Sequence, residues 1–218
     1  MKVSFGVTVH NEGECINGLL NQLHEHIERS DSWDEIIILD DNSDDPDTVR
    51  ILESYSDLPY VQLHRRALER DFGAQKSYLN TLCSGDYIFQ IDADERLAPE
   101  LLENLHSILT SYPNVDLFYI PRINTVEELT EEHIQAWNWQ VNESGWVMWP
   151  DFQTRLYRNS PEIIWIGKVH ERIDGFDTFA HLPQEEVYAI IHHKHITRQE
   201  EQNAFYGQII QDAVQGLE

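Results

Sequence analysis

The chain is poor in cysteine and in basic residues, and it has no long hydrophobic run. Its 218 residues include two cysteines, Cys15 and Cys83, so the sequence offers no disulfide framework. Both lie in apolar helical patterns, which predicts buried thiols. No segment approaches the roughly 20 apolar residues of a membrane-spanning helix, and the first residues carry no basic flank or cleavage site. We therefore expect no membrane span and a cytoplasmic location.

Positive charge is scarce. Fifteen Lys and Arg stand against 39 Asp and Glu, for a formal net charge of −24 at pH 7. A chain this acidic repels the phosphates of nucleic acids and of anionic membranes, which argues against both as partners. An anionic ligand would need a bound cation or a few well-placed basic side chains.

The chain has enough apolar residues for a folded core, and its strand and helix patterns alternate regularly along the first half. Hydrophobic residues make up 41% of the chain, which with its length fits one domain. Strand patterns cover residues 2–9, 35–39, 60–63 and 86–91, and helical patterns cover about 12–27, 46–55, 72–83 and a segment from Pro99. This alternation, continuing to about residue 112, predicts an α/β fold with a mainly parallel sheet and helices on both faces.

The second half of the chain is less regular. We expect strands at 115–121, 154–157, 162–166 and 187–193, an acidic helix at 127–137 and a closing helix at 198–214. No repeat, low-complexity tract or linker interrupts the chain. The sequence therefore predicts one domain, with a nucleotide-binding half at 1–112 and an elaborated half at 113–218.

Polar residues follow three of the predicted strands. They are Thr8 to Asn11, Asp40 to Ser43 and Asp92 to Glu95. Ligands of open parallel sheets bind outside the carboxyl ends of the strands, so we expect these clusters to converge on one edge. Asp92 and Asp94, one small residue apart, suit a hard divalent cation that carries substrate phosphates. The alternative is that these two carboxylates cap the helix near Pro99. We expect Glu95 to begin the next turn.

Together these motifs resemble family 2 glycosyltransferases of the GT-A fold. The similar segments are Thr8-Val9-His10-Asn11-Glu12, Ile37 to Ser43, Gly73-Ala74-Gln75-Lys76, and Asp92-Ala93-Asp94. Downstream, Trp165 to Arg172 looks like the Val-His-Glu segment of compact bacterial and phage-type members. Thr8 and His10 depart from the pattern, because many members carry Pro and Tyr there.

The resemblance implies a role for each of these residues. It implies that Asp94 binds Mn²⁺ or Mg²⁺ and that Asp92 contacts the metal or the ribose. It implies that Asp41 accepts the uracil N–H, although Asp-Asn-Ser also forms turns by itself. Thr8, Val9 and Glu12 would complete the nucleotide pocket. Separately, from their place beside the predicted nucleotide edge, we expect Arg70 or Lys76 to support the diphosphate; the alternative is that they lie on a solvated helix face.

The candidates for the catalytic base and for the third metal ligand lie in the second half of the chain. An inverting transfer needs a carboxylate to deprotonate the acceptor hydroxyl, and we expect Glu171 in this role beside His170, with Asp151 as the rival. Strand alternation puts His193 and His195 on one face and His192 on the other. Resemblance to a His-x-Lys segment implies that His192 binds the metal. Trp137, Trp139, Trp146 and Trp149 form either a small core or a platform for an acceptor sugar.

These expectations combine into one leading function. We expect a metal-dependent, inverting glycosyltransferase that moves a sugar from a UDP-sugar to a hydroxyl of a saccharide or other acceptor. Nucleotidyl transfer is an alternative that uses the same paired aspartates, but the turn after residue 9 lacks a Gly-rich phosphate loop. A non-catalytic module that binds nucleotide sugars is the other alternative.

Overall fold

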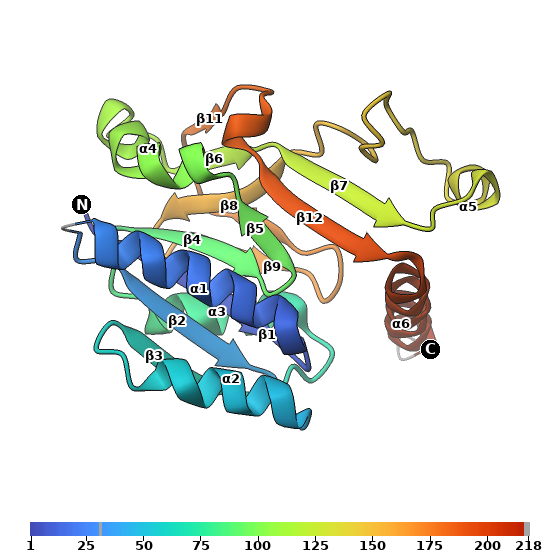
Figure 1. Cartoon of the computed structure of the whole chain (residues 1–218), viewed down its shortest axis with the longest axis horizontal. Coiled ribbons are helices and arrows are strands. Elements are labelled where there is room, and N and C mark those ends of the chain that lie inside the picture. The colour runs from blue at the N-terminus through green and yellow to red at the C-terminus, as the bar shows by residue number, and fades with distance from the viewer. Residues whose placement is uncertain (31, 216–218) are drawn as a thin grey trace.

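A computed structural model gives the fold of residues 1–30 and 32–215 (Figure 1). The first half contains β1 (Val3–Val9), α1 (Gly13–Arg29), β2 (Glu35–Asp40), α2 (Pro46–Ser56), β3 (Val61–Arg65), α3 (Phe72–Leu82), β4 (Tyr87–Asp92), β5 (Glu95–Leu97) and α4 (Pro99–Ser111). The second half contains β6 (Leu117–Ile120), β7 (Arg122–Glu127), α5 (Glu131–Ala136), β8 (Gln153–Arg158), β9 (Ile164–Ile166), β10 (Arg172–Asp174), β11 (Phe179–His181), a 3₁₀ turn η1 (Glu186–Tyr188), β12 (Ile190–His195) and α6 (Ile196–Gln215). None of the helices within the described residues is long and apolar enough to cross a bilayer.

The main sheet is mixed and mostly parallel. Its seven strands run in the order β11-β6-β8-β4-β1-β2-β3. Strands β4, β1, β2 and β3 are parallel neighbours, β11 is parallel to β6, and β8 runs antiparallel between β4 and β6. The predicted α/β fold is confirmed, and the second half adds β8, β6 and β11 to the sheet, with β8 antiparallel to both of its neighbours.

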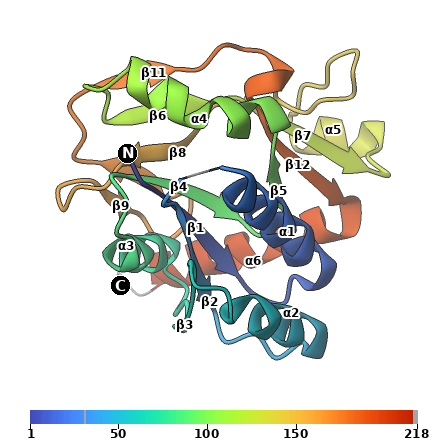
Figure 2. The same cartoon turned by 60° about the vertical axis from the view of Figure 1, so that its left-hand side comes forward.

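Helices cover both faces of this sheet, as the alternation along β2 illustrates. Ile36 and Ile38 belong to a core that includes buried residues of α1, α2 and α4. Ile37 and Leu39 belong to a second core that includes Leu79 of α3. Successive strand side chains point to opposite faces, so an uninterrupted apolar strand needs a cover on each. Figure 2 shows α1 and α2 on one side of the strands and α3 on the other.

A second, three-stranded sheet lies beside the carboxyl end of β4. In it β12 pairs antiparallel with β5 and parallel with β7. The expectation that Glu95 begins a turn is wrong, because Glu95 is the first residue of β5 and pairs with His192. The acidic helix is also shorter than expected, because residues up to Glu127 extend β7 alongside β12.

The exposure of Cys15 is a third correction. This residue is exposed, whereas Cys83 is buried as expected. The buried stripe of α1 consists of Ile16, Leu19, Leu20, Leu23 and Ile27, and Cys15 lies just outside it. The helical pattern of the sequence thus predicted the buried stripe of α1 correctly, but it included Cys15, which lies one residue before the first buried residue of that stripe.

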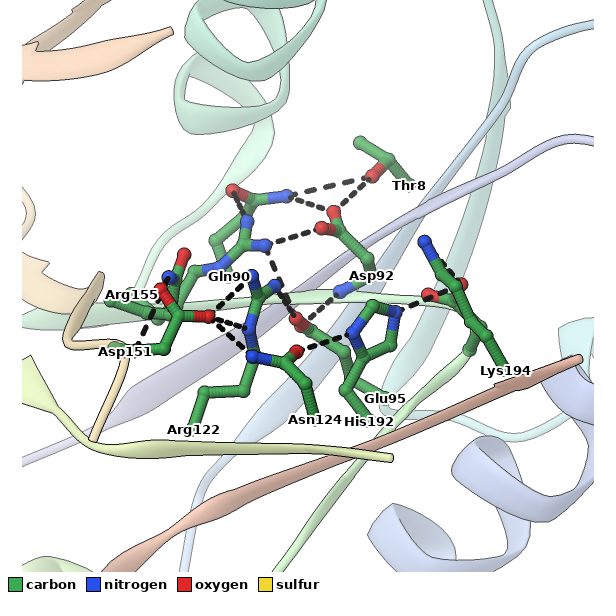
Figure 3. A network of polar contacts seen from close by, with 12 residues as sticks. Thr8, Gln90, Asp92, Glu95, Arg122, Asn124, Asp151, Arg155, His192 and Lys194 are labelled. Atoms are coloured by element: carbon green, nitrogen blue, oxygen red, sulfur yellow. Dashed lines mark hydrogen bonds and ion pairs between the residues drawn. The ribbon is translucent and has the colours of Figure 1, made fainter. Parts of the chain in front are cut away.

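A buried ionic cluster joins the two sheets (Figure 3). Arg155 of β8 forms an ion pair with Asp92 at the end of β4, and its Nη2 lies 3.3 Å from Oε1 of Glu95 in β5. Arg122 of β7 reaches the same Oε1 at 2.9 Å. The Glu95 side chain is completely buried, and its Oε2 accepts the backbone N–H of Asp92 at 3.0 Å. Four strands therefore meet through two arginines and two carboxylates.

The start of α3 packs against a loop between β9 and β10. The backbone N–H of Gly73 donates to the carbonyl of Gly167 at 3.1 Å, and that of Phe72 donates to Lys168 at 3.0 Å. A Cβ on Gly73 would lie 2.5 Å from the Gly167 carbonyl oxygen. Glycine is therefore required at residue 73, and this contact places the loop that continues to Glu171.

We predict that Gly73→Ala destabilises the protein by about 1–3 kcal/mol, because the added methyl group meets backbone that must shift. The matched control is Gly207→Ala in α6, where a Cβ meets nothing within 4 Å. Alanine favours a helix by roughly 0.5–1 kcal/mol, so the control should not destabilise. Urea unfolding of the two variants measures the difference, and equal stabilities would contradict the packing described.

We also predict that Arg155→Met lowers the free energy of unfolding by about 3 kcal/mol, because it removes the nearest cationic partner of Asp92 and one of the two arginines that pair with the buried Glu95. The control is Arg50→Met, which removes an ion pair whose side chains are 71% and 73% exposed and should change stability by less than about 0.5 kcal/mol. Adding Asp92→Asn to Arg155→Met should recover part of the loss. A double variant no more stable than Arg155→Met would contradict the view that the uncompensated charge of Asp92 causes part of the loss.

Candidate functional site

The three polar clusters converge as predicted. A cavity of about 850 Å³ opens at the carboxyl ends of β1, β2 and β4. Its lining includes Thr8, Val9, Glu12, Asp41, Lys76, Asp92, Asp94, Asp151, Glu171 and His192, all from the sequence-based set. Residues from both halves of the chain therefore face one space.

Tight turns after β1 and β2 bring their side chains to the cavity. Asn11 and Asn42 have positive φ angles of 51° and 49°, which asparagine tolerates better than most residues. The backbone N–H of Asp41 donates to the Val9 carbonyl at 2.9 Å, and Asp41 Oδ1 accepts the N–H of Leu68 at 2.7 Å. One oxygen of Asp41 thus serves the local fold, while the residue also lines the cavity.

Asp92 faces the inner wall of the cavity. Its Oδ1 accepts the hydroxyl of Thr8 at 3.2 Å and lies 3.5 Å from Lys76 Nζ, while Oδ2 pairs with Arg155. Burial alone would raise the pKa of this carboxyl, but Arg155 and then Lys76 hold the pKa well below its usual range. Asp92 is therefore ionised and already neutralised by the protein.

Asp94 lies in the turn after β4 and contacts a different set of groups. Its Oδ2 lies 3.3 Å from His192 Nε2, 3.5 Å from Arg198 Nη2 and 3.8 Å from Lys194 Nζ. Burial would raise the pKa of Asp94, but the hydrogen bond and charge of His192 keep the pKa below its usual range. His192 Nδ1 is held by the side-chain oxygen of Asn124 at 2.9 Å, which orients the ring toward Asp94.

Asp94 and His192 fit a divalent cation. Their facing atoms are separated by 3.3 Å, close to the roughly 3 Å between neighbouring ligands of an octahedral ion with 2.0–2.1 Å bonds. One carboxylate oxygen and one imidazole nitrogen form a donor set that Mn²⁺ accepts. Asp92 is directed toward Arg155 instead. His193 and His195 are exposed on the opposite face of β12, as strand alternation predicted.

Glu171 and Lys76 form a buried pair on another wall of the cavity. Lys76 Nζ donates to Glu171 Oε1 at 2.6 Å and lies 4.8 Å from the centre of the Trp165 ring. Burial raises the pKa of Glu171, but the charge of Lys76 outweighs it and lowers the pKa. Lys76 is thus buried rather than on a solvated helix face. His170, just before Glu171, has a φ of 51° and is exposed.

Asp151, the rival base, is held by several donors. Arg122 reaches its Oδ2 through Nε at 2.9 Å and Nη2 at 2.8 Å. Asn124 Nδ2 donates to the same oxygen at 2.7 Å, and Gln153 Nε2 donates to Oδ1 at 2.9 Å. With four hydrogen-bonding donors around it, this carboxylate is more constrained than Glu171.

Glu12 reaches the cavity from the start of α1. It pairs with Arg198 of α6 through Oε1, while its Oε2 is buried without a hydrogen-bond partner. An unpartnered buried carboxylate oxygen is costly unless a ligand supplies a donor. Arg70, the other candidate for the diphosphate, is exposed in the loop before α3.

Sequence reasoning missed most of the basic residues of this cavity. Arg122, Arg155, Lys194 and Arg198 line it together with Lys76. Lys194 could have been found, because alternation along β12 places it on the same face as His192. Arg155 lies within a predicted strand beside apolar neighbours, and a buried arginine there signals a partner.

The tryptophans lie on the segment between α5 and β8, which Figure 1 shows leading back from α5 toward the main sheet. The ring centres of Trp137 and Trp139 are 4.7 Å apart, and those of Trp146 and Trp149 are 4.9 Å apart. Trp139 lines the cavity. The four rings therefore pack in pairs, and one of them is placed to meet a ligand.

Comparisons with known proteins agree with this geometry. An uncharacterised glycosyltransferase of Rickettsia felis is 32% identical over 114 residues, which cover 51% of this chain and 35% of that protein. An undecaprenyl-phosphate 4-deoxy-4-formamido-L-arabinose transferase of Pseudomonas syringae is 25% identical over 152 residues, 68% of this chain and 39% of that one. The chain spans between a third and two fifths of the length of these relatives.

The fold is shared with S. aureus TarS. The structure of TarS 1-349 in complex with UDP-GlcNAc superposes with a TM-score of 0.64 at 17% identity, covering 89% of this chain and 59% of that chain. A family model for glycosyl transferase family 2 matches residues 4–179. This match includes β1, β4 and the loop that carries Glu171, and it confirms the resemblance read from the motifs. The chain belongs to glycosyl transferase family 2.

Proposed function

We propose that this chain is a metal-dependent, inverting glycosyltransferase that moves a sugar from a UDP-sugar to an acceptor hydroxyl. The observation that carries the proposal is the pairing of Asp94 with His192 in a cavity rich in basic side chains, within a chain of net charge −24. Membership of family 2 supports sugar transfer, and the complex of TarS with UDP-GlcNAc supports a UDP-sugar donor.

The nucleotide would lie across the carboxyl ends of β1 and β2. Asp41 Oδ2 would accept the uracil N–H, since Oδ1 is already occupied by Leu68. Thr8, Val9 and Glu12 line the same part of the cavity. The unpartnered Oε2 of Glu12 is free to accept a hydroxyl or amide proton from the nucleotide.

The diphosphate would lie between Asp94 and the basic residues. Lys194 and Arg198 are directed at this carboxylate and can turn to phosphate oxygens. A divalent cation held by Asp94 and His192, with Asp92 nearby, would offset the charge that develops on the leaving diphosphate. Arg155 and Lys76 fix Asp92, so the wall behind the ribose and phosphates stays rigid.

Glu171 is the proposed base. Its carboxylate accepts the proton of the acceptor hydroxyl while that oxygen attacks the anomeric carbon. The bond from that carbon to the diphosphate breaks on the opposite side, and UDP leaves with the electron pair. Because this is a single displacement in which the attacking oxygen and the departing diphosphate lie on opposite faces of the anomeric carbon, the configuration there inverts. Asp151, with its four donors, positions Arg122 and Asn124 in this account.

One set of assays separates this function from its alternatives. The protein is incubated with Mn²⁺ and UDP-glucose, UDP-galactose or UDP-GlcNAc, and UDP release is followed. UDP release supports glycosyl transfer, whereas binding without turnover supports a non-catalytic module. Release of pyrophosphate from a nucleoside triphosphate and a sugar phosphate would instead support nucleotidyl transfer. Either of the last two outcomes would overturn the proposal.

We predict that Glu171→Gln lowers kcat by about 10²–10⁴-fold, the usual contribution of a general base, with little change in nucleotide affinity. Glu185→Gln, an exposed carboxylate on the loop after β11, is the matched control and should retain wild-type turnover. If Glu171→Gln keeps the wild-type rate and Asp151→Asn loses it, the base is Asp151.

We predict a pH effect from the Lys76–Glu171 pair. Lys76 lowers the pKa of Glu171, so the base stays ionised until the pH falls below the ordinary range of a carboxyl group. In Lys76→Met the charge and hydrogen bond of Lys76 are lost, whereas burial and the charge of Asp92 remain and raise the pKa of Glu171. The acid limb of the kcat/KM profile should therefore move to higher pH in Lys76→Met, whereas Lys168→Met, which removes an exposed lysine of the same loop, should leave it unchanged. Superimposable profiles for wild type and Lys76→Met would contradict this role of Lys76.

A further inference from the structure

Two histidines and an aspartate meet at the opposite edge of the sheet from the cavity. His26 lies in the last turn of α1, Asp34 immediately precedes β2, and His106 lies in α4. One ligand atom from each lies within 4.8 Å of the others. Since the cavity opens at the carboxyl ends of the strands and Asp34 precedes the amino end of β2, this group is separate from the donor site.

The three side chains are held in place by the fold. The Asp34 side chain is completely buried, and its Oδ1 accepts the backbone N–H of Val3 at 2.7 Å. Its Oδ2 lies 2.8 Å from His106 Nε2 and 3.9 Å from His26 Nε2. The ring of Phe5 packs edge-on against His26 with a centroid distance of 5.8 Å.

His26 supplies the second observation. Its Nε2 is buried and has no hydrogen-bond partner, although it faces Asp34 from 3.9 Å. Burial removes the water that would hydrogen-bond to an imidazole nitrogen, and without a partner in the protein this loss of hydration is not compensated. A cation between the three groups would satisfy this nitrogen and would also bind the Asp34 carboxylate that faces it.

The geometry suits a tetrahedral ion. Zinc binds imidazole nitrogen and carboxylate oxygen at about 2.0–2.2 Å, which puts neighbouring ligand atoms roughly 3.3–3.6 Å apart. The observed separations of 2.8 and 3.9 Å from Asp34 Oδ2 lie on either side of this range. Small side-chain rotations would bring both within it. The His106 side chain is 33% exposed, which leaves a route for the ion and space for a water as the fourth ligand.

We propose that His26, Asp34 and His106 bind a divalent cation of the zinc class, independently of the cation proposed for the donor site. The bound ion would tie the end of α1, the start of β2 and α4 to one another, and through the Asp34–Val3 hydrogen bond it would also fix the start of β1. Its expected role is structural, because no cavity wall of the donor site is involved.

Titration with Zn²⁺ tests the proposal on protein without a histidine tag. The full chain carrying Asp94→Asn is used, so that the donor site does not contribute its own cation. In this background we expect one Zn²⁺ per chain by calorimetry, and a melting temperature raised by about 5–10 °C at a 100-fold excess over Kd. Co²⁺ should give the intense visible absorption of a tetrahedral complex.

The test variant is His106→Ala, because His106 is partly exposed and its loss leaves the Asp34–Val3 hydrogen bond in place. The matched control is His193→Ala, an exposed histidine with a carboxylate 3.9 Å away. We expect His106→Ala to lose the Zn²⁺ shift and the Co²⁺ absorption, and His193→Ala to keep both. Circular dichroism without metal verifies that both variants fold.

Equal Zn²⁺ stoichiometry and affinity for His106→Ala and its parent would overturn the proposal, as would the absence of Zn²⁺ binding by the parent. If His106→Ala does not fold, His106→Gln takes its place in the same titration, with the same two outcomes. Neither result bears on turnover of a UDP-sugar, so failure here is distinguishable from failure of the proposed function.

Discussion

The ion pair between Arg155 and the carboxylates of Asp92 and Glu95 is the interaction on which the cavity depends. It joins β8 of the main sheet to the end of β4 and to β5 of the small sheet. A buried charge without a partner is costly, so these strands must lie in a register that places each charge beside its partner. The result is a rigid floor, formed by residues far apart in the sequence, at the edge where the first half presents its polar turns.

Because the chain as a whole is strongly acidic, the clustering of basic side chains in the cavity is what allows an anionic ligand to bind there. Five of the 15 Lys and Arg residues line one cavity, namely Lys76, Arg122, Arg155, Lys194 and Arg198. Scattered over a surface with 39 acidic residues they would do little against the net charge. Concentrated in one place of low exposure, they make a local region that tolerates phosphate, because charges interact more strongly where water is excluded. Lys76, Arg122 and Arg155 pair with carboxylates of the cavity wall. Arg198 also pairs with Glu12, but Arg198 and Lys194 are the basic side chains that approach Asp94, beside the position proposed for the diphosphate.

Local patterns predicted the first half well. The uninterrupted apolar run of β2 indicated a sheet covered on both faces, and the polar residues after β1, β2 and β4 indicated a shared edge. Alternation along β12 separated His192 from His193 and His195. Each of these inferences depends on neighbours in the sequence, whose relative directions are fixed by the backbone.

Local sequence patterns could not predict the contacts between segments that are far apart in the sequence. Glu95 was assigned to a turn because its strand is three residues long and is defined by pairing with β12, almost 100 residues away. The pairing of Lys76 with Glu171 and of Arg155 with Asp92 likewise follows from how β8 and the Glu171 loop pack on the first half. Cys15 was misplaced because the boundary of a buried helical stripe depends on what packs beside it, which the helix alone does not determine.

The most direct measurement is an anomalous difference map from crystals grown with UDP and Mn²⁺, recorded at the manganese absorption edge. The account predicts a manganese peak between Asp94 and His192, in contact with the diphosphate of a nucleotide that lies across the carboxyl ends of β1 and β2. Nucleotide bound at that edge with no manganese peak beside Asp94, or nucleotide bound elsewhere on the protein, would contradict it.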